Sequence, residues 1–209
     1  MDQYPGDEQA ATYDQMLVMF KLLMGKVQLP PGAYCVVLVA VIAEKIGDCM
    51  RAMRDSGIAN SGDKNQCRVI TWQKTGHFSR GVNQLPFDTE TYVMCVYSEN
   101  KEWPPNLFKS WFGGKFDRGT PTSSVINVPS NSSKPTHLVD GKMVPVNKTC
   151  EPETLGYFFA QAFLLRSDEN IVLLPGVGAG GLARGIAYWG GSFVGFDNRQ
   201  CQVKYCKDW

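Results

Sequence analysis

The sequence predicts an α/β fold with a largely parallel sheet. Three observations support this prediction. Residues 33–41 form a continuous apolar run, which is typical of a strand buried on both faces. Amphipathic helical patterns alternate with such runs along the chain. A glycine-rich turn follows the apolar run 171–174, and a helical segment then leads into a second run, 192–196.

The composition is that of an ordinary globular protein. The chain has 209 residues, 44% of them hydrophobic and 20% charged, and a net charge of +1. This charge excludes a strong field that would steer the chain to nucleic acid or to an anionic membrane. No apolar run reaches transmembrane length, and residues 1–6 lack the basic and apolar regions that are typical of a signal peptide. We expect one domain, with a first half over 1–99, a long loop over 100–149 and a second half over 150–209, and no membrane partner.

The cysteines indicate a reducing environment. Seven are present, an odd number without a Cys-x-x-Cys pair, and several lie within apolar strand patterns, where cysteine behaves as a small hydrophobic residue. We therefore expect an intracellular, reducing compartment and no metal site.

The first helix is predicted by its cap. Thr12 and Gln15 have the spacing of a capping box, and Met16, Phe20 and Leu23 then recur at helical spacing. After the strand 33–41, residues 42–56 form an amphipathic pattern that Gly57 ends.

Two further strands follow in the first half. Residues 67–73 form one of them, and 89–97 alternate in polarity and are expected to pair with it antiparallel. The segment 100–149 is irregular, with one short strand expected at 124–128, and a loop this long is typical of a functional or partly disordered segment.

The second half opens with a helix. Pro152 is placed where a helix can begin, and apolar residues then form one stripe. The stripe consists of Leu155, Phe158, Phe159, Ala162 and Leu165.

The glycine turn predicts a site for a nucleoside-containing cofactor. Pro175, Gly176, Gly178 and Gly180 would let the backbone approach the ligand, and Asp197 would accept hydrogen bonds from ribose hydroxyls. A dinucleotide fits the same spacing, and a purely structural turn is the third alternative. The position of the unit late in the chain favours the nucleoside cofactor, because a dinucleotide-binding unit usually opens its domain.

The order of these elements resembles that of the circularly permuted S-adenosylmethionine-dependent methyltransferases that modify exocyclic amino groups of DNA bases. Residues 174–182 align with the family motif Asp-Pro-Phe-x-Gly-Ser-Gly-Thr-Thr, and 191–197 with Gly-x-x-Phe-Ile-Gly-x-Asp. Residues 147–152 align with His-Pro-x-x-Lys-Pro, which adds Thr149 and Pro152 to the cofactor site. The resemblance implies a Rossmann-like methyltransferase sandwich, S-adenosylmethionine as cofactor, and DNA or RNA as substrate.

The catalytic motif of the family, Asp/Asn-Pro-Pro-Tyr, falls on residues 2–6, so that Asp2, Tyr4 and Pro5 are the catalytic candidates. Their order differs from that of the motif. Because the acid and a carbonyl hold the flipped-out base while the ring stacks on it, a changed order misplaces the acceptor nitrogen. The family's acid and aromatic in the cofactor turn are Leu174 and Gly176 here. We therefore expect feeble or absent methyl transfer; the alternative is an inactive subunit that supports a protein partner or homodimer.

The resemblance also predicts differences at the two ends of the chain. The strand 171–174 is expected to lack its usual neighbour, so that either an upstream segment is missing or the sheet has been rebuilt, and the last strand of the cofactor half is expected beyond Trp209.

Overall fold

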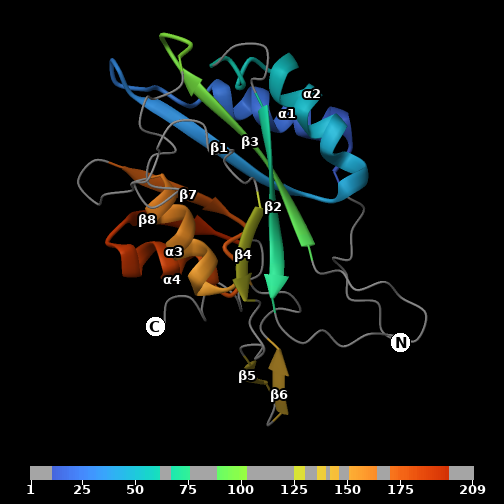
Figure 1. Cartoon of the computed structure of the whole chain (residues 1–209), viewed down its shortest axis with the longest axis vertical. Coiled ribbons are helices and arrows are strands. Elements are labelled where there is room, and N and C mark those ends of the chain that lie inside the picture. The colour runs from blue at the N-terminus through green and yellow to red at the C-terminus, as the bar shows by residue number, and fades with distance from the viewer. Residues whose placement is uncertain are drawn as a thin grey trace. The chain divides into compact units, whose positions relative to one another are not determined.

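A computed structural model describes residues 11–61, 67–75, 89–102, 125–129, 136–139, 142–145, 151–163 and 170–197 (Figure 1). The chain divides into two compact units, which are described separately. Unit 1 comprises Met1–Gln73, Phe87–Pro104 and Ser123–Ile126, and unit 2 comprises the remaining residues.

Unit 1 contains most of the residues of a four-stranded sheet in the order β1-β3-β2-β4. The strands are β1 (Tyr34–Val41), β2 (Cys67–Thr75), β3 (Thr89–Ser98) and β4 (Val125–Pro129). β3 pairs antiparallel with both β1 and β2, so these two strands run in the same direction. A helix connects β1 to β2, as a crossover between such strands requires, and β3 is inserted between them. The expected antiparallel pairing of β2 with β3 is confirmed.

The two helices of unit 1 begin differently. α1 (Tyr13–Met24) has the expected capping box: Gln15 N donates to Thr12 Oγ1, and Thr12 N donates to Gln15 Oε1. α2 (Ile46–Asp55) follows the 3₁₀ turn η1 (Ala43–Lys45), so the helix predicted over 42–56 begins later than expected. Gly57 ends it with φ of +82°, a conformation that favours glycine.

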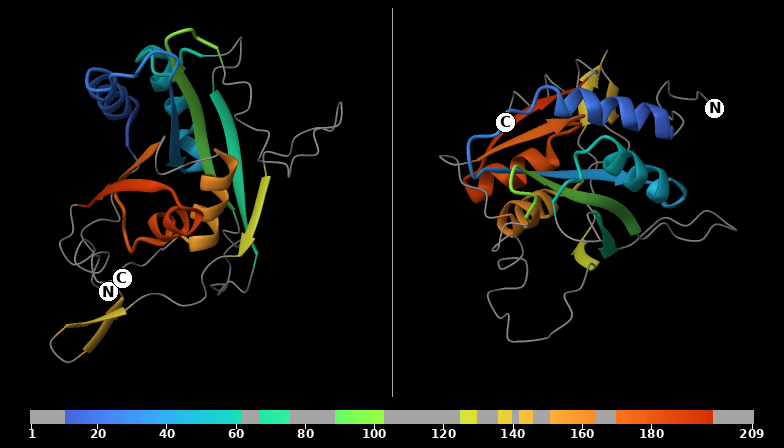
Figure 2. Two further views of the ribbon diagram at one scale, coloured as in Figure 1. Left: turned by 90° about the vertical axis from the view of Figure 1, so that its left-hand side faces the viewer. Right: turned by 90° about the horizontal axis from the view of Figure 1, so that it is seen from above.

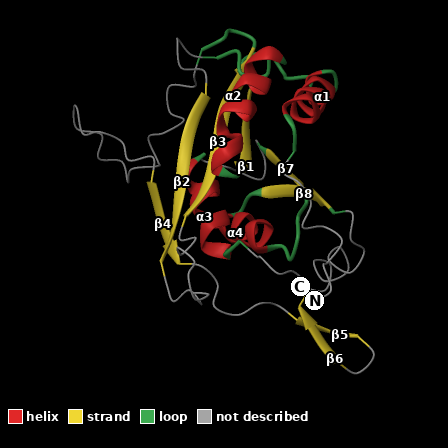
Figure 3. Cartoon of the chain, turned by 90° about the vertical axis from the view of Figure 1, so that its right-hand side faces the viewer, coloured by secondary structure: helices red, strands yellow, loops and turns green. Residues whose placement is uncertain are grey.

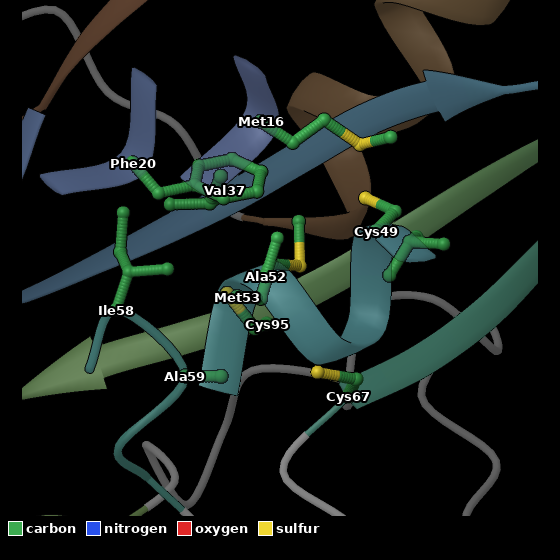
Figure 4. Close-up of a cluster of buried hydrophobic side chains, with 11 residues drawn as sticks. Met16, Phe20, Val37, Cys49, Ala52, Met53, Ile58, Ala59, Cys67 and Cys95 are labelled. Atoms are coloured by element: carbon green, nitrogen blue, oxygen red, sulfur yellow. The ribbon is translucent and has the colours of Figure 1, made fainter. Parts of the chain in front are cut away.

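Both helices cover the same face of the sheet (Figure 2). Met16 and Phe20 of α1 and Met53 of α2 pack with residues of β1, β2 and β3 in one apolar cluster, whose side chains are drawn in Figure 4. β3 is the buried strand, since every residue from Tyr92 to Val96 is buried. The prediction that 33–41 is buried on both faces is wrong, because β1 pairs on one side with β3 and has a single buried residue, Val37.

The buried cysteine thiols of this cluster make the free energy of unfolding depend on pH. Burial raises the pKa of Cys49 from 9.0 to about 11, with a further contribution from Cys67, and burial also raises the pKa of Cys95. Because the unfolded chain then loses these protons at lower pH than the folded chain, stability is full below pH 9 and falls as pH rises toward 11. We expect the urea midpoint to fall between about pH 8 and pH 10, and to fall less in Cys49→Ala. An equal fall in both proteins would contradict a role for Cys49.

Unit 2 contains the glycine turn predicted from sequence. Its elements are β5 (Thr136–Val139), β6 (Lys142–Pro145), α3 (Glu153–Ala162), β7 (Ile171–Pro175), α4 (Gly181–Trp189) and β8 (Ser192–Phe196). β7 and β8 pair in parallel and α4 connects them, while α3 lies beside α4 (Figure 3). The expected strand–turn–helix–strand unit is confirmed. β5 and β6 form an antiparallel hairpin that was not predicted from the sequence.

The described strands pair in both directions, whereas the sequence predicted a largely parallel sheet. Among the described strand pairs, β7–β8 is parallel, whereas β3 is antiparallel to both its neighbours. β7 is also less buried than its apolar sequence predicts: Ile171 is 70% and Leu173 55% exposed, on the face that they share. Within 100–149, β4 agrees with the expected strand at 124–128, and most of the remaining residues lie outside the described ranges.

Candidate cofactor-binding turn

Two glycines allow α3 and α4 to pack closely. A Cβ atom on Gly185 would overlap the backbone of α3 at Glu153 O and Tyr157 N. A Cβ atom on Gly156 would overlap the backbone of α4 at Leu182. The two helices therefore touch backbone to backbone, and this contact sets the first turn of α3 against the start of α4, where the glycine turn ends.

The turn from β7 to α4 requires glycine at three positions. Gly176, Gly178 and Gly180 have φ of +71°, +56° and +79°, which residues with a side chain rarely adopt. Gly176 is exposed, and a Cβ atom placed there would meet no atom within 4 Å. Gly178 and Gly180 are buried. The expectation that all three line a ligand pocket stays a prediction.

Asp197 lies against this turn, directly after β8. Its Oδ2 accepts a hydrogen bond of 3.0 Å from Gly178 N. The adjacent carbonyl of Phe196 accepts from Gly176 N at 2.8 Å and from Val177 N at 3.0 Å. Gly195 completes this packing, since a Cβ atom there would lie 2.9 Å from Val177 Cγ2. The ends of β7 and β8 thus form one hydrogen-bonded structure.

Arg184 joins the turn to α3. Its Nη1 lies 2.9 Å from Glu153 Oε1, and its Nη2 donates to Ala179 O at 3.2 Å. The carboxylate of Glu153 lies in the first turn of α3, where the helix dipole favours a negative charge. Arg184 therefore contacts both the first turn of α3 and the glycine turn.

The structure brings together some of the residues predicted from sequence. Pro175 ends β7, the three glycines form the turn that follows it, and Asp197 lies against that turn, while Pro152 is buried as the N-cap of α3. Asp2, Tyr4, Pro5 and Thr149 lie outside the described residues. Their assigned roles in catalysis or cofactor binding stay predictions.

Arg184 and the paired glycines of α3 and α4 were not predicted from the sequence. A glycine inside a helical pattern is a signal of close packing, because it lowers helix stability unless the contact requires it. Gly156 and Gly185 carry that signal. Arg184 carries none, since an arginine on a helix is ordinary until its partners are known.

No group of three or more His, Cys, Asp or Glu side chains among the described residues could hold a metal ion. None of their helices combines the length and the apolar character that crossing a membrane requires.

The chain has the Rossmann-like α/β fold of S-adenosylmethionine-dependent DNA methyltransferases. It is similar to M1.HpyAVI in complex with SAM, with a TM-score of 0.62 and 15% identity over 98% of this chain and 84% of that chain. It is also similar to TTHA0409 of Thermus thermophilus in complex with S-adenosyl-L-methionine, with a TM-score of 0.51 and 16% identity over 94% and 75% of the two chains. The cytosine-N4-specific PvuII DNA methyltransferase matches with a TM-score of 0.57 and 11% identity over 97% and 73%. No family model and no curated protein matches the chain.

Proposed function

We propose that this chain binds S-adenosylmethionine at the glycine turn and is an intracellular methyltransferase that acts on amino groups of nucleic-acid bases. The observation that carries the proposal is the contact of Asp197 with Gly178 at the carboxyl ends of two parallel strands, where open α/β sheets bind their ligands. Two similar structures contain this cofactor, and one similar structure is a DNA methyltransferase that acts on cytosine N4.

The hydrogen bonds of the turn favour this cofactor over a dinucleotide. Gly176 N and Val177 N donate to Phe196 O, Gly178 N donates to Asp197, and Gly180 N donates to Val177 O. A pyrophosphate needs backbone N–H donors that point to it. Protein acceptors thus occupy the N–H groups of Gly176, Val177, Gly178 and Gly180, which leaves few donors within the turn itself for a phosphate.

The residues of the turn fit S-adenosylmethionine in two respects. The exposed Gly176 leaves open space next to its backbone, and the half-buried carboxylate of Asp197 offers hydrogen-bond acceptors for hydroxyl groups. When bound, the cofactor supplies an activated methyl group. The contribution of this chain would be to hold the nucleoside and orient it, because methyl transfer depends on positioning.

Calorimetric titration of S-adenosylmethionine and of NAD into the purified chain tests the proposal. We expect heat of binding for S-adenosylmethionine and none for NAD. Tighter binding of NAD would contradict the assignment and would support the dinucleotide alternative.

One observation favours a second candidate, an inactive methyltransferase-fold subunit. Gly176 has φ of +71°, so an aromatic residue would be strained where the resembled family carries one, and Leu174 supplies no carboxylate. Such a subunit would retain the cofactor and support a protein partner or a second copy of itself. Its function would then be assembly.

Methyl transfer separates the two candidates. Incorporation of tritiated methyl groups into mixed DNA and RNA is compared for the chain and its Asp2→Ala variant. Incorporation that Asp2→Ala abolishes would establish an enzyme in which Asp2 is catalytic. Incorporation that requires an added partner protein would establish the subunit.

A further inference from the structure

Arg184 contacts the carboxylate of Glu153 in α3 and a backbone carbonyl of the glycine turn. The guanidinium pairs with Glu153 at 2.9 Å and donates to Ala179 O at 3.2 Å. The Arg184 side chain is 22% exposed, so the protein shelters most of it from solvent. Charge-assisted hydrogen bonds are stronger in such surroundings than in water.

The peptide between Ala179 and Gly180 is held at both ends. Ala179 O accepts from Arg184, and Gly180 N donates to Val177 O at 3.0 Å. Because a peptide unit is planar, holding its oxygen and its nitrogen fixes its orientation. This matters here because the residue on its carboxyl side is a glycine at positive φ, with wide conformational freedom once a contact is lost.

We propose that Arg184 is a positioning residue for cofactor binding, which holds the glycine turn in its binding conformation through Ala179 O and Glu153. This inference rests on the proposed function, since it assigns Arg184 to the same turn. The planar guanidinium can bond both acceptors at once, whereas the single ammonium group of lysine is a point charge. Lysine is therefore expected to keep the ion pair with Glu153 and to lose the hold on the turn.

The test compares Arg184→Lys and Arg184→Ala with wild type. Arg51→Lys is the matched control, because Arg51 also pairs with a carboxylate, that of Asp48 at 3.1 Å, but in unit 1. Three quantities are measured: hydrogen exchange of the Gly180 amide by NMR, the urea midpoint, and the Kd of S-adenosylmethionine by calorimetry.

We expect Arg184→Lys to speed Gly180 exchange and to weaken S-adenosylmethionine binding, each about tenfold, the effect of one lost hydrogen bond to a charged group. Its urea midpoint should fall by no more than the tenfold loss implies, about 1.4 kcal/mol, and Arg51→Lys should match wild type in Gly180 exchange and in the Kd of S-adenosylmethionine. Wild-type exchange and affinity in Arg184→Lys would overturn the inference, because the ion pair alone would then suffice. If the wild-type chain binds no S-adenosylmethionine, the proposed function fails, and the Gly180 exchange alone decides whether Arg184 holds the turn.

Discussion

Replacing Gly185 with alanine is expected to cost about 3 kcal/mol of unfolding free energy, at the upper end of the cost of overpacking. The added Cβ atom would overlap Glu153 O and Tyr157 N, which belong to the backbone of α3. Backbone atoms cannot rotate away as a side chain does, so the two helices must separate. Urea denaturation measures the loss.

Gly47→Ala is the matched control for this change. Gly47 lies in α2, and a Cβ atom there would meet no atom within 4 Å. Alanine at this position should stabilise the chain by roughly 0.5–1 kcal/mol, because alanine is the better helix former. A Gly185→Ala chain that unfolds at the wild-type urea concentration would show that α3 and α4 do not pack through these glycines.

Replacing Asp197 with alanine is expected to weaken S-adenosylmethionine binding by about 10- to 100-fold, equivalent to 1.5–3 kcal/mol for hydrogen bonds to a charged group. The change removes the acceptor proposed for the cofactor, and it removes the bond to Gly178 N. Asp197→Asn keeps a carbonyl oxygen that can accept from Gly178, so its loss should be smaller. Calorimetry measures the Kd of each variant.

Asp14→Asn is the control for Asp197→Asn. Asp14 is exposed in the first turn of α1, in unit 1, and its neutralisation should leave the Kd unchanged. Wild-type affinity in Asp197→Ala would remove Asp197 from the cofactor site and leave it the structural role of holding the turn.

Local features of this protein could be predicted from the sequence because they depend on residues close together in the chain. The capping box of α1 joins Thr12 to Gln15, three residues later, and both hydrogen bonds form as expected. The glycine turn could be predicted because glycine has no Cβ atom and adopts positive φ readily, as Gly176, Gly178 and Gly180 do. The parallel pairing of β7 with β8 follows from the helix that connects them.

The tertiary structure decided what depends on partners distant in sequence. The apolar run 33–41 predicted a strand buried on both faces, but β3 occupies that place because it is inserted between β1 and β2. The same holds for the site. Arg184 acquires a role only when helix packing brings Glu153 to it, and that packing depends on Gly156 and Gly185, whose missing side chains matter only where two backbones meet. A pattern in one segment indicates which face of it is apolar, whereas the neighbours that the fold supplies determine what that face or side chain contacts.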